Sequence, residues 1–483
     1  MYQEVFSDPK APRTVVVIPS MSLDPEELAK IPGVMHYEER MLCLLMLLKL
    51  PRTQLVYVTS SELDPAIIDY YLHLLPGIPG RHARDRLQLL SMGDDSLTPL
   101  SAKILSRPDR LEKLRRLIRY PQAAHMTCFN SSPLERTLAV QLEVPMYACD
   151  PDLSHLGNKS RSRTTFRDVG LNLPAGFEDL QNRQDLIDAL VQLAMTDSNT
   201  SRAVVKLNDG FSGEGNAVAH LEPISESPSP ARAAERLLVE GLQFEASHET
   251  WESYEPKFEA MGGIVEEFIE HDRVQSPSVQ MRIDPLGEAQ LVSTHDQVLS
   301  GPSGQVFLGC TFPARRRYRA DLHEAGFVVA EALKGHGVIG RFGVDFVSTP
   351  GVDGWDHYAI EINLRKGGTT LPYLMLDFLT DGDYDPGTGE FFTPSGETRY
   401  YYATDNLVDE AYLGLSPSDL IDITVLEGLH YNATRQQGLV FHLIGSVTDH
   451  GKIGMVSIAD GRGEAKRQYE AAVASLDRAT HGS

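Results

Sequence analysis

Four side chains that could hold a metal ion and an anionic substrate gather in one short stretch past the middle of the chain. Gly343–Ser348 (GVDFVS) and His357–Arg365 (HYAIEINLR) both alternate apolar and polar residues, and a proline and two glycines lie between them. This pattern predicts a β-hairpin with a longer loop. Glu361, Asn363 and Arg365 are two residues apart along the second strand, so their side chains point to one face of it.

Symmetric pairing of these two strands places Asp345 opposite Glu361. Two carboxylates about 4 Å apart repel by roughly 4 kcal/mol at an effective dielectric constant of about 20, so a cation is expected between them. With the amide oxygen of Asn363, they form a set of hard oxygen ligands that suits Mg²⁺ held jointly with the phosphates of a substrate. The alternative is an exposed hairpin whose charges are solvated.

A glycine-rich loop follows a lysine-bearing strand earlier in the chain. Ala203–Leu207 (AVVKL) is a short apolar strand that carries Lys206, and it leads through NDGFSGEGN into a second strand at Ala217–Leu221. Three glycines within six residues allow backbone N–H groups to approach an anion closely. The loop matches neither the Walker pattern, because Asn216 stands in place of its lysine, nor the GxGxxG fingerprint. Taken alone, it is also consistent with a plain turn.

A third element, Gly262–Glu270 (GGIVEEFIE), is an apolar strand that ends in paired acids and an aromatic residue. The order of a lysine strand, a glycine-rich loop, a V-E-E-F-I strand and a D…E-x-N-x-R hairpin resembles the ATP-grasp superfamily, in which two α+β lobes close on ATP. The match extends from about His155 to Asp383 and is most specific at the E-x-N-x-R end and at the lysine strand.

The resemblance implies a role for each matching residue. Lys159 and Lys206 would contact the α- and β-phosphates, and the glycine-rich loop would close over the triphosphate. The V-E-E-F-I strand would be the hinge that hydrogen-bonds adenine. Either Glu267 or Glu270 would bind the ribose, and Arg365 would steady the substrate carboxylate or the acyl phosphate made from it. The implied ATP contacts are Lys159, Lys206, Gly210, Ser212, Gly213, Gly215, Glu266, Glu267, Phe268, Ile269 and Glu270, and the implied ligands of Mg²⁺, expected as two ions, are Asp345, Glu361 and Asn363.

The C-terminal region narrows the resemblance. Val440–Asp460 predicts two strands around a turn, followed by a helix through Gln468–Leu476. This piece, together with GRFGVDFV…AIEINLRKGGTTLP, is similar to the peptide ligases of the pheganomycin type. The resemblance implies a mixed α/β and α+β protein, with a doubly wound pre-ATP-grasp domain over residues 1–154, a two-lobed ATP-grasp domain over 155–385, and a small α+β domain over 386–483.

The first 150 residues alternate between strand and helix signals. Short apolar runs at 14–19, 54–59, 86–91 and 124–129 are suited to a covered parallel sheet, and helical stretches at 37–49, 65–75, 101–119 and 133–142 lie beside them. This alternation predicts a doubly wound, three-layer domain. The first strand leads into PSMS without a glycine fingerprint, so neither NAD nor FAD is expected there. The domain is either a scaffold and dimer surface or a contributor to the substrate cleft.

Composition agrees with this interpretation. The chain has 483 residues, which is enough for about three domains that each bury a core. Its 44 Lys+Arg against 67 Asp+Glu give a net charge of −23, which argues against a nucleic-acid partner. The four cysteines form no CxxC pair, so neither a zinc site nor a disulfide framework is predicted. The N-terminus has no hydrophobic signal core, and the longest apolar run, Met41–Leu48, is too short for a membrane span, so a cytoplasmic protein without membrane contact is expected.

Further cationic residues are candidates for binding substrate. Arg341 lies four residues before Asp345 and is a candidate for contact with the reacting centre. Arg282 and His295 lie on predicted strands that would face the same cleft, although a lone histidine is more often structural. Arg315 begins a basic cluster that either docks an anionic substrate group or pairs with a helix end.

These features predict an ATP-dependent carboxylate–amine ligase. A substrate carboxylate would attack the γ-phosphate of ATP to form an acyl phosphate, and an amine would then displace phosphate from it, with Arg365 and Arg341 stabilising the oxyanion. By resemblance, the partners are a small carboxylic acid and a peptide or amine, and the setting is peptide natural-product (antibiotic) biosynthesis. The glycine-rich loop would also keep water from the acyl phosphate.

Three other functions stay open on the sequence. The enzyme could join the acid to a small amine or amino acid in place of a peptide. A nucleotide-binding regulator could retain the fold without the chemistry. A biotin-dependent carboxylase subunit shares the E-x-N-x-R hairpin, but the N- and C-terminal regions resemble those of peptide ligases. A homodimer is a further expectation.

Overall fold

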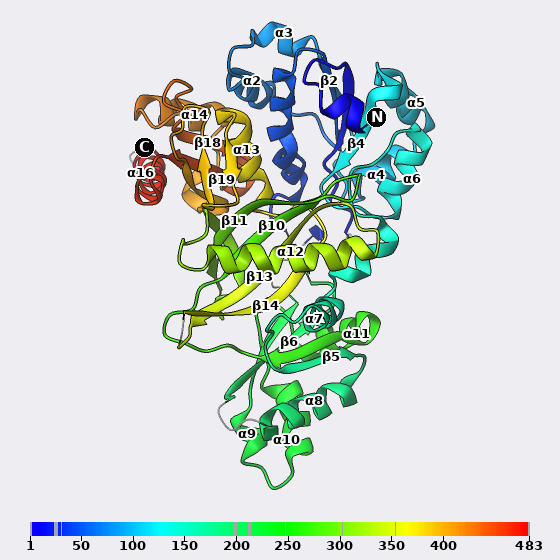
Figure 1. Ribbon diagram of the computed structural model, residues 1–483, viewed down its shortest axis with the longest axis vertical. Coiled ribbons are helices and arrows are strands. Elements are labelled where there is room, and N and C mark those ends of the chain that lie inside the picture. Colours follow the sequence, from blue (N-terminus) through cyan, green and yellow to red (C-terminus); the bar gives the residue numbers. More distant parts are fainter. Residues whose placement is uncertain are drawn as a thin grey trace.

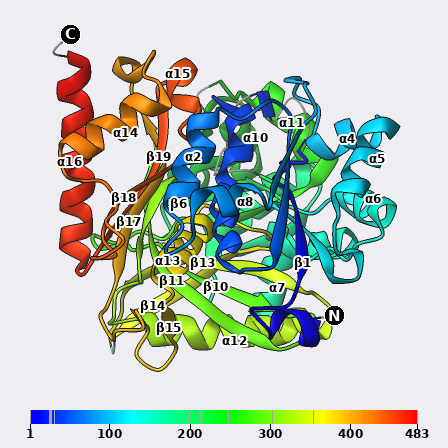
Figure 2. The ribbon, with the colours of Figure 1, turned by 90° about the horizontal axis from the view of Figure 1, so that it is seen from above.

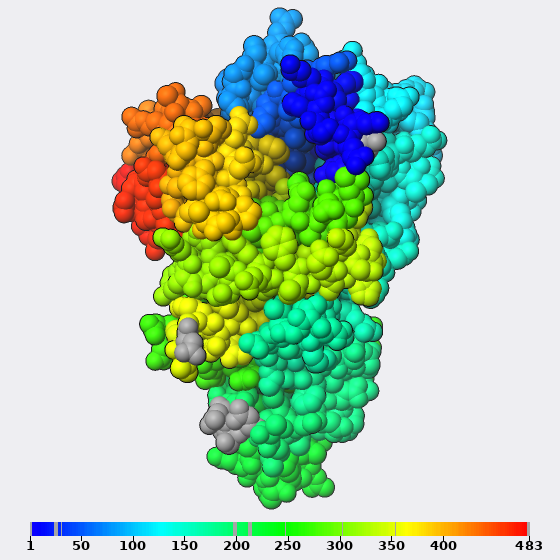
Figure 3. Space-filling view, viewed as in Figure 1, coloured from blue at the N-terminus to red at the C-terminus, as the bar shows by residue number. Residues whose placement is uncertain are grey.

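The computed structural model describes residues 2–23, 28–29, 31–196, 200–210, 215–246, 248–301, 303–352 and 354–481. The molecule is elongated, with the N-terminal and C-terminal parts side by side at one end and a lobe of residues from about 160 to 270 projecting from the other (Figure 1). Figure 3 shows this lobe as the narrower part of the surface, in teal and green. The mixed α/β and α+β fold predicted from the sequence is confirmed.

The N-terminal domain is built on a parallel sheet in the order β3-β2-β1-β4. Its strands are β1 (Arg13–Ile18), β2 (Thr53–Thr59), β3 (Leu87–Ser91) and β4 (Ala124–Cys128), close to the predicted runs. The chain moves outward from β1 to β2 and β3 and then returns to the other side of β1. The carboxyl ends of β1 and β4 therefore flank the point where the strand order reverses, which is where open α/β sheets bind ligands.

Helices cover both faces of this sheet (Figure 2). They are η1 (Tyr2–Phe6), η2 (Val34–Lys49), α2 (Pro65–His73), α3 (Gly80–Arg84), α4 (Leu100–Leu105), α5 (Pro108–Leu117), η3 (Pro121–Ala123) and α6 (Pro133–Leu142). The helix predicted over 101–119 is wrong in one respect, because Pro108 begins a second helix. The helix predicted over 133–142 is confirmed, and the Ser132 side chain caps it by accepting from the amide of Leu134.

The projecting lobe is an antiparallel sheet in the order β5-β9-β6-β7-β8. Its strands are β5 (Gly176–Leu180), β6 (Arg202–Leu207), β7 (Asn216–His220), β8 (Gln243–Phe244) and β9 (Gly263–Glu267). Its helices are α8 (Arg183–Thr196), α9 (Glu222–Ser225), α10 (Pro230–Glu240) and α11 (Trp251–Met261), and η4 (Pro151–Gly157) and α7 (Lys159–Asp168) join it to the rest. The predicted lysine strand and V-E-E-F-I strand are neighbours here, as β6 and β9.

The body of the molecule is one eight-stranded sheet in the order β14-β13-β10-β11-β12-β17-β19-β18. Its strands are β10 (Pro277–Ile283), β11 (Ala289–Ser300), β12 (Val306–Phe312), β13 (Gly340–Pro350), β14 (Trp355–Asn363), β17 (Tyr400–Val408), β18 (Gly438–His442) and β19 (Lys452–Ala459). Helix α12 (Arg319–Gly335) packs across β10 and β11 through buried apolar residues (Figure 1).

The C-terminal region extends this sheet. Beyond α13 (Thr370–Thr380) and the small hairpin of β15 (Asp383–Asp385) and β16 (Glu390–Phe392), strand β17 pairs with β12, and β19 pairs with β17. The remaining helices are η5 (Glu410–Tyr412), α14 (Pro417–Leu426), α15 (Ser446–His450) and α16 (Arg462–His481). The turn predicted between the two C-terminal strands is the short helix α15. The division into domains after residues 154 and 385 stays a proposal, since the sheet is continuous across the second boundary.

One apolar core joins the two ends of the chain. The buried residues of η2 pack with α13 and with the C-terminal strands, in a cluster that includes Leu45, Leu371, Val440 and Met455. The predicted burial of Met41–Leu48 is thereby confirmed. Within the described residues, no helix is both long enough and apolar enough to cross a membrane.

Candidate active site

A pocket of about 840 Å³ lies between the projecting lobe, the eight-stranded sheet and the N-terminal domain. We call it the central pocket. This volume is in the range of sites that bind small molecules and cofactors. Strands β6 and β9 contribute Lys206 and Glu266, the β13–β14 hairpin contributes Asp345 and Glu361, and the N-terminal domain contributes Phe129. The N-terminal domain is therefore part of the cleft wall, which was one of its two predicted roles.

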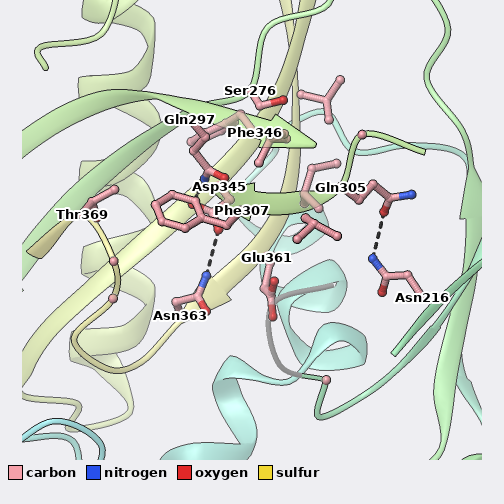
Figure 4. A pocket seen from close by; sticks show the side chains of 18 of the residues that line it. Asn216, Ser276, Gln297, Gln305, Phe307, Asp345, Phe346, Glu361, Asn363 and Thr369 are labelled. Carbon is pink, nitrogen blue, oxygen red and sulfur yellow. Dashed lines mark hydrogen bonds between the residues drawn. The ribbon is translucent and has the colours of Figure 1, made fainter. Parts of the chain in front are cut away.

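The β13–β14 hairpin has the predicted register. Asp345 is the pairing partner of Glu361, and a bulge follows directly after Asp345. The Asn363 side chain donates to the Asp345 carboxylate at 2.9 Å, and Gln297 of β11 donates to its other oxygen at 2.8 Å. Figure 4 shows the side chains of Asn363 and Gln297 pointing to Asp345, with Glu361 nearby on the same strand as Asn363. Sequence patterns gave no indication of Gln297, because it lies far away in the chain.

The charges at this junction are not balanced. Burial, and then the nearby Glu361, raise the pKa of Asp345 to about 7. Burial also raises the pKa of Asp209, with Glu361 adding to the shift and Lys159 opposing it. The Lys159 ammonium lies 3.4 Å from Glu361, and Arg365 acts against the raised pKa of Asp345, so two cations face the three carboxylates. A further positive charge at this point would favour the ionised forms.

The donor set fits a magnesium ion shared with a nucleotide. No group of three His, Cys, Asp or Glu side chains in the described part of the chain is arranged to hold a metal on its own. Asp345 and Glu361 supply two carboxylates and Asn363 one amide, which leaves room in the coordination sphere for phosphate oxygens and water. Mg²⁺ in nucleotide sites is bound in this way, by one or two carboxylates together with phosphates.

Lys206 is held by a buried acid. Its ammonium bonds with Glu266, whose other carboxylate oxygen accepts from Arg163 at 2.8 Å. Glu266 and Arg163 are each 2% exposed, so the charges are paired out of contact with water. Glu266 lines the central pocket, and its side chain fixes Lys206 at the pocket wall, while its predicted place in an adenine-binding hinge stays a prediction.

The hinge strand presents its end to the central pocket. Glu267, Phe268 and Ile269 all line it. The amide of Glu267 donates to the carbonyl of Ala175 at 2.7 Å, and the amide of Phe268 donates to that of Arg202 at 3.0 Å. These bonds tie the strand end to its neighbours and leave Ile269 as the next residue along the wall.

The two glutamates left open for the ribose are distinguished by their surroundings. Glu270 is exposed, bonds with Arg202 and Ser201, and lies outside the lining of the central pocket. Glu267 lies on the pocket wall. We therefore propose Glu267 for the ribose and remove Glu270 from the proposed site.

The described ends of the glycine-rich loop lie at the phosphate side. Gly210 lies against Gly215, and a Cβ atom at Gly210 would come within 3.5 Å of the Lys159 ammonium. The Gly215 carbonyl accepts from the buried Tyr254 hydroxyl at 3.0 Å. The predicted contacts Ser212 and Gly213 lie outside the described residues. A close approach of an anion to Gly210 is sterically open.

Arg365 and Arg341 both line a smaller cavity, and of the two only Arg365 also lines the central pocket. Four residues along a strand span roughly 13 Å, which separates Arg341 from the metal-ligand junction at Asp345. The predicted contact of Arg341 with the reacting centre therefore stays a prediction, because Arg341 lies outside the central pocket but shares the smaller cavity with Arg365.

The remaining predicted substrate residues also lie outside the central pocket. His295 is fully buried in an aromatic cluster, 2.6 Å from the Tyr401 hydroxyl, and burial lowers its pKa to about 3. Arg282 bonds with Gln290 on the adjacent strand β11. Arg315 lies 3.6 Å from Asp296, so it forms an internal ion pair. These positions favour structural roles, which local sequence patterns do not separate from binding roles.

The end of the central pocket away from the hinge was not predicted. It is lined by Arg40 and Tyr37 of η2, Asp405 of β17 and Lys452 of β19. Arg40 forms a buried ion pair with Asp405, and its Nε has no hydrogen-bond partner among the described residues. Lys452 donates to the Tyr37 hydroxyl at 2.8 Å. We call these four residues the acceptor end.

Comparison with known proteins agrees with this geometry. A family model described as IQCH-like ATP-grasp matches residues 151–243 and 238–386, and one described as PGM1 C-terminal domain matches 419–472. Residues 151–386 are therefore an ATP-grasp domain. The resemblance predicted from the sequence is confirmed, and so is the enzyme class, an ATP-dependent ligase that forms carbon–nitrogen bonds.

Two curated relatives match most of the chain. L-propargylglycine–L-glutamate ligase of Streptantibioticus cattleyicolor is 28% identical over 92% of this chain and 90% of its own length. IQ motif-containing protein H of Danio rerio is 23% identical over 93% of this chain, which spans 47% of that longer protein.

Solved structures confirm the fold. One is N5-carboxyaminoimidazole synthetase from Staphylococcus aureus, complexed with ADP. The alignment covers 96% of this chain and 98% of the synthetase chain, with a TM-score of 0.53 and 14% sequence identity. Another is the biotin carboxylase domain of Hydrogenobacter thermophilus 2-oxoglutarate carboxylase, in complex with MgADP. The alignment covers 95% of this chain and 89% of that chain, with a TM-score of 0.55 and 13% sequence identity. At such identities the likeness concerns the fold alone.

Proposed function

We propose that this protein joins the carboxylate of a small acid to the amine of an amino acid through an acyl phosphate, with release of ADP and phosphate. The observation that carries the proposal is the Asp345–Glu361 junction, which adjoins Lys159 and lies in the same pocket as the hinge. A nucleotide whose adenine lies at the hinge would extend its phosphates toward this junction.

The first step transfers the γ-phosphoryl group to a carboxylate oxygen. A new P–O bond forms to the acid, the bridging bond to the β-phosphate breaks, and ADP leaves. Bound Mg²⁺, proposed as two ions, would neutralise charge on the phosphates. Lys159 and Lys206 bind the α- and β-phosphates in this proposal, and Arg365 orients the acid.

The second step forms the amide bond. The amine nitrogen attacks the acyl carbon, the bond from that carbon to the phosphate oxygen breaks, and the departing phosphate carries the proton released by the amine. Arg365 stabilises the tetrahedral oxyanion in this step. The reaction requires no Ser or Cys nucleophile.

The acceptor end suits an amino acid as the amine substrate. Asp405 can accept from an ammonium group, and Arg40 and Lys452 place positive charge beside it for a carboxylate. The printed name of the bacterial relative also specifies two amino acids. Both observations favour the amino-acid alternative over the peptide substrate predicted first, and a role in antibiotic or other natural-product biosynthesis stays a proposal.

A substrate screen tests the proposed function. Pairs of amino acids, and amino acids with short peptides, would be incubated with ATP and Mg²⁺, and ADP release and product mass would be measured together. The expected result is ADP formed in equal amount to an amide product of mass equal to the two substrates minus water.

Two outcomes would contradict the proposal. ATP binding without ADP release across the panel would favour a nucleotide-binding regulator, and ADP release that depends on bicarbonate would favour a carboxylase. A product that contains a peptide amine would restore the first prediction. The expected homodimer is checked separately by light scattering of the eluted protein.

A further inference from the structure

A second, smaller cavity adjoins the central pocket. Its volume is about 130 Å³, which is room for roughly four water molecules at ~30 Å³ each. We call it the side chamber. It shares Phe129 and Arg365 with the central pocket, so the two cavities meet at the arginine assigned to the reacting acid. A carboxylate with a short alkyl chain fits such a volume, and a nucleotide does not.

The side chamber is lined by cations. Arg341 on β13 and Arg365 and Lys366 after β14 contribute to its wall, and its described lining includes no Asp or Glu. Among the described residues, no carboxylate lies within ion-pair distance of Arg341 or Lys366, and the buried Asp377 acts on Arg341 only at longer range. Lys366 is oriented by the Thr127 hydroxyl, which accepts from its ammonium at 3.1 Å, and by the Cys128 carbonyl.

The buried His125 also lines the side chamber. His125 is 9% exposed, and its Nδ1 has no hydrogen-bond partner among the described residues. Burial, then Arg13 and Lys366, lower its pKa to about 4, so its ring is neutral near pH 7. Burial also lowers the pKa of Lys366, and the neighbouring Arg341 adds to this shift. The positive charges here repel one another, and a bound anion would relieve that repulsion.

The chamber lies where the fold favours ligand binding. Val15 of β1 and His125, Thr127 and Phe129 along β4 belong to its wall. These strands flank the point where the order of the parallel sheet reverses. The wall residues alternate along β4, so the side chamber lies over one face of the parallel sheet beside this point, and the eight-stranded sheet contributes the cations.

We propose that the side chamber binds a second carboxylate of the substrate, the one that does not react. The substrate is then an acidic amino acid whose reacting group lies beside Arg365 while Arg341 and Lys366 bind its other carboxylate. This inference rests on the proposed function and adds the substrate class. It also gives Arg341 a role, recognition of substrate, that differs from the one predicted on its sequence position.

A binding experiment tests the proposal without turnover. Isothermal titration of the full-length protein, with ADP and Mg²⁺ present, would compare L-glutamate with L-glutamine, which differ in the charge at the side-chain end. L-aspartate and inorganic phosphate would be titrated in parallel. We expect at least 10-fold tighter binding of the acidic amino acid, and Arg341→Met is expected to reduce this preference to less than 3-fold.

The matched control is Arg282→Met. Arg282 pairs with Arg341 across β10 and β13 but lies outside the chamber, so this variant removes a neighbouring positive charge only. Its preference for the acidic amino acid should stay within about 3-fold of the parent. Arg341→Lys, which keeps the charge, should restore part of the preference. If Arg341→Met fails to fold, Lys366→Met tests the same chamber from its other wall.

Several results would overturn the inference. Equal affinity for L-glutamate and L-glutamine with equal affinity for L-aspartate and its amide would exclude a carboxylate site. A preference that survives both Arg341→Met and Lys366→Met would place recognition elsewhere. Phosphate binding that is lost in these variants, without binding of an acidic amino acid, would assign the chamber to free phosphate.

The inference and the proposed function fail in different ways. Ligation of neutral amino acids, with no preference for acidic ones, would refute the chamber and keep the ligase. Charge-selective binding in a protein that forms no amide with any pair would keep the chamber and refute the ligase.

Discussion

The two cavities that meet at Arg365 carry opposite charge. In the central pocket, Asp345 lies opposite Glu361 on the paired strand. Burial, and then the negative charge of Glu361, raise the pKa of Asp345 to about 7. In the side chamber, Arg341 and Lys366 share a wall that includes no described carboxylate. The first cavity has an excess of negative charge and the second an excess of positive charge.

This difference indicates what each cavity receives. Buried charges that lack a partner in the chain are costly, and they persist where a ligand supplies the partner. A cation that arrives with ATP would balance the carboxylates of the central pocket. An anionic group of the substrate would balance the arginine and lysine of the side chamber. The sign of each imbalance therefore predicts the charge of the ligand.

The largest expected effect comes from changing a carboxylate of the central pocket. Glu361→Gln removes one of the two carboxylates, and we expect kcat for ADP release to fall about 10³-fold, or about 4 kcal/mol of transition-state stabilisation. Because Glu361 adds to the shift at Asp345, the ligand-free variant should be at least as stable as the parent in magnesium-free buffer. Steady-state kinetics and thermal melting measure the two quantities.

The control for this variant is Glu331→Gln, on the exposed face of α12, where Glu331 lies 3.5 Å from Lys334. It should change neither kcat nor the melting temperature appreciably. Unchanged turnover in Glu361→Gln would refute the assignment of the metal-ligand junction.

The next effect tests the phosphate side of the central pocket. Lys206→Met removes a cation that Glu266 fixes at the wall, and we expect the KM for ATP to rise about 10²-fold with a smaller change in kcat. Lys257→Met is the matched control in the same lobe, since Lys257 bonds with Glu249 away from the pocket. An equal rise in both variants would indicate a general loss of stability in the lobe.

The parts of the site that could be predicted from the sequence are local. Asp345 and Glu361 lie on one hairpin, so alternation and a symmetric turn were enough to pair them correctly. Lys206 lies on a short apolar strand next to the glycine-rich loop, and its place on the pocket wall follows from that strand. In both cases the relevant contacts are close in the chain.

The parts that could not be predicted depend on contacts between distant segments. Arg40 and Asp405 are 365 residues apart and meet only because η2 packs against the C-terminal strands. Arg341 was placed at the reacting centre on sequence distance alone, although a strand extends it by about 3.3 Å per residue. Glu270 was left equal to Glu267 because its partner Arg202 lies on another strand.

A third prediction concerns the acceptor end, which neither cavity's charge imbalance explains. Asp405→Asn should raise the KM of the amine substrate about 30-fold and leave the KM of ATP within about 3-fold, because Asp405 lies far from the hinge in the same pocket. It should also lower stability by roughly 3–5 kcal/mol, since Arg40 would stay buried without its partner.

The double variant Arg40→Met/Asp405→Asn separates these two effects. Removing both charges should recover much of the lost stability, whereas the KM of the amine should remain raised. Asp381→Asn is the control, because it breaks the more exposed ion pair with Lys49. Recovery of the KM together with stability would show that the ion pair has a structural role only.

The smallest expected effect concerns a titratable group that lies in neither cavity. Burial lowers the pKa of His295 to about 3, from an ordinary value of 6.5, so the folded protein holds it neutral. Because the unfolded chain takes up a proton below pH 6.5 and the folded chain does not, this contribution to stability is complete above pH 6.5 and is lost as the pH falls toward 3. His295→Gln should therefore reduce the difference in unfolding free energy between pH 7 and pH 5 by about 2 kcal/mol.

Chemical denaturation at the two pH values measures this difference, and the exposed His336 provides the control variant His336→Gln. Turnover at pH 7 should change little in His295→Gln, because the ring packs against Phe312 and Tyr401 and does not reach the central pocket. A large loss of kcat with retained stability would instead place His295 at the substrate cleft, which was the other role left open by the sequence. The aromatic cluster around His295 would then contribute to turnover as well as to stability.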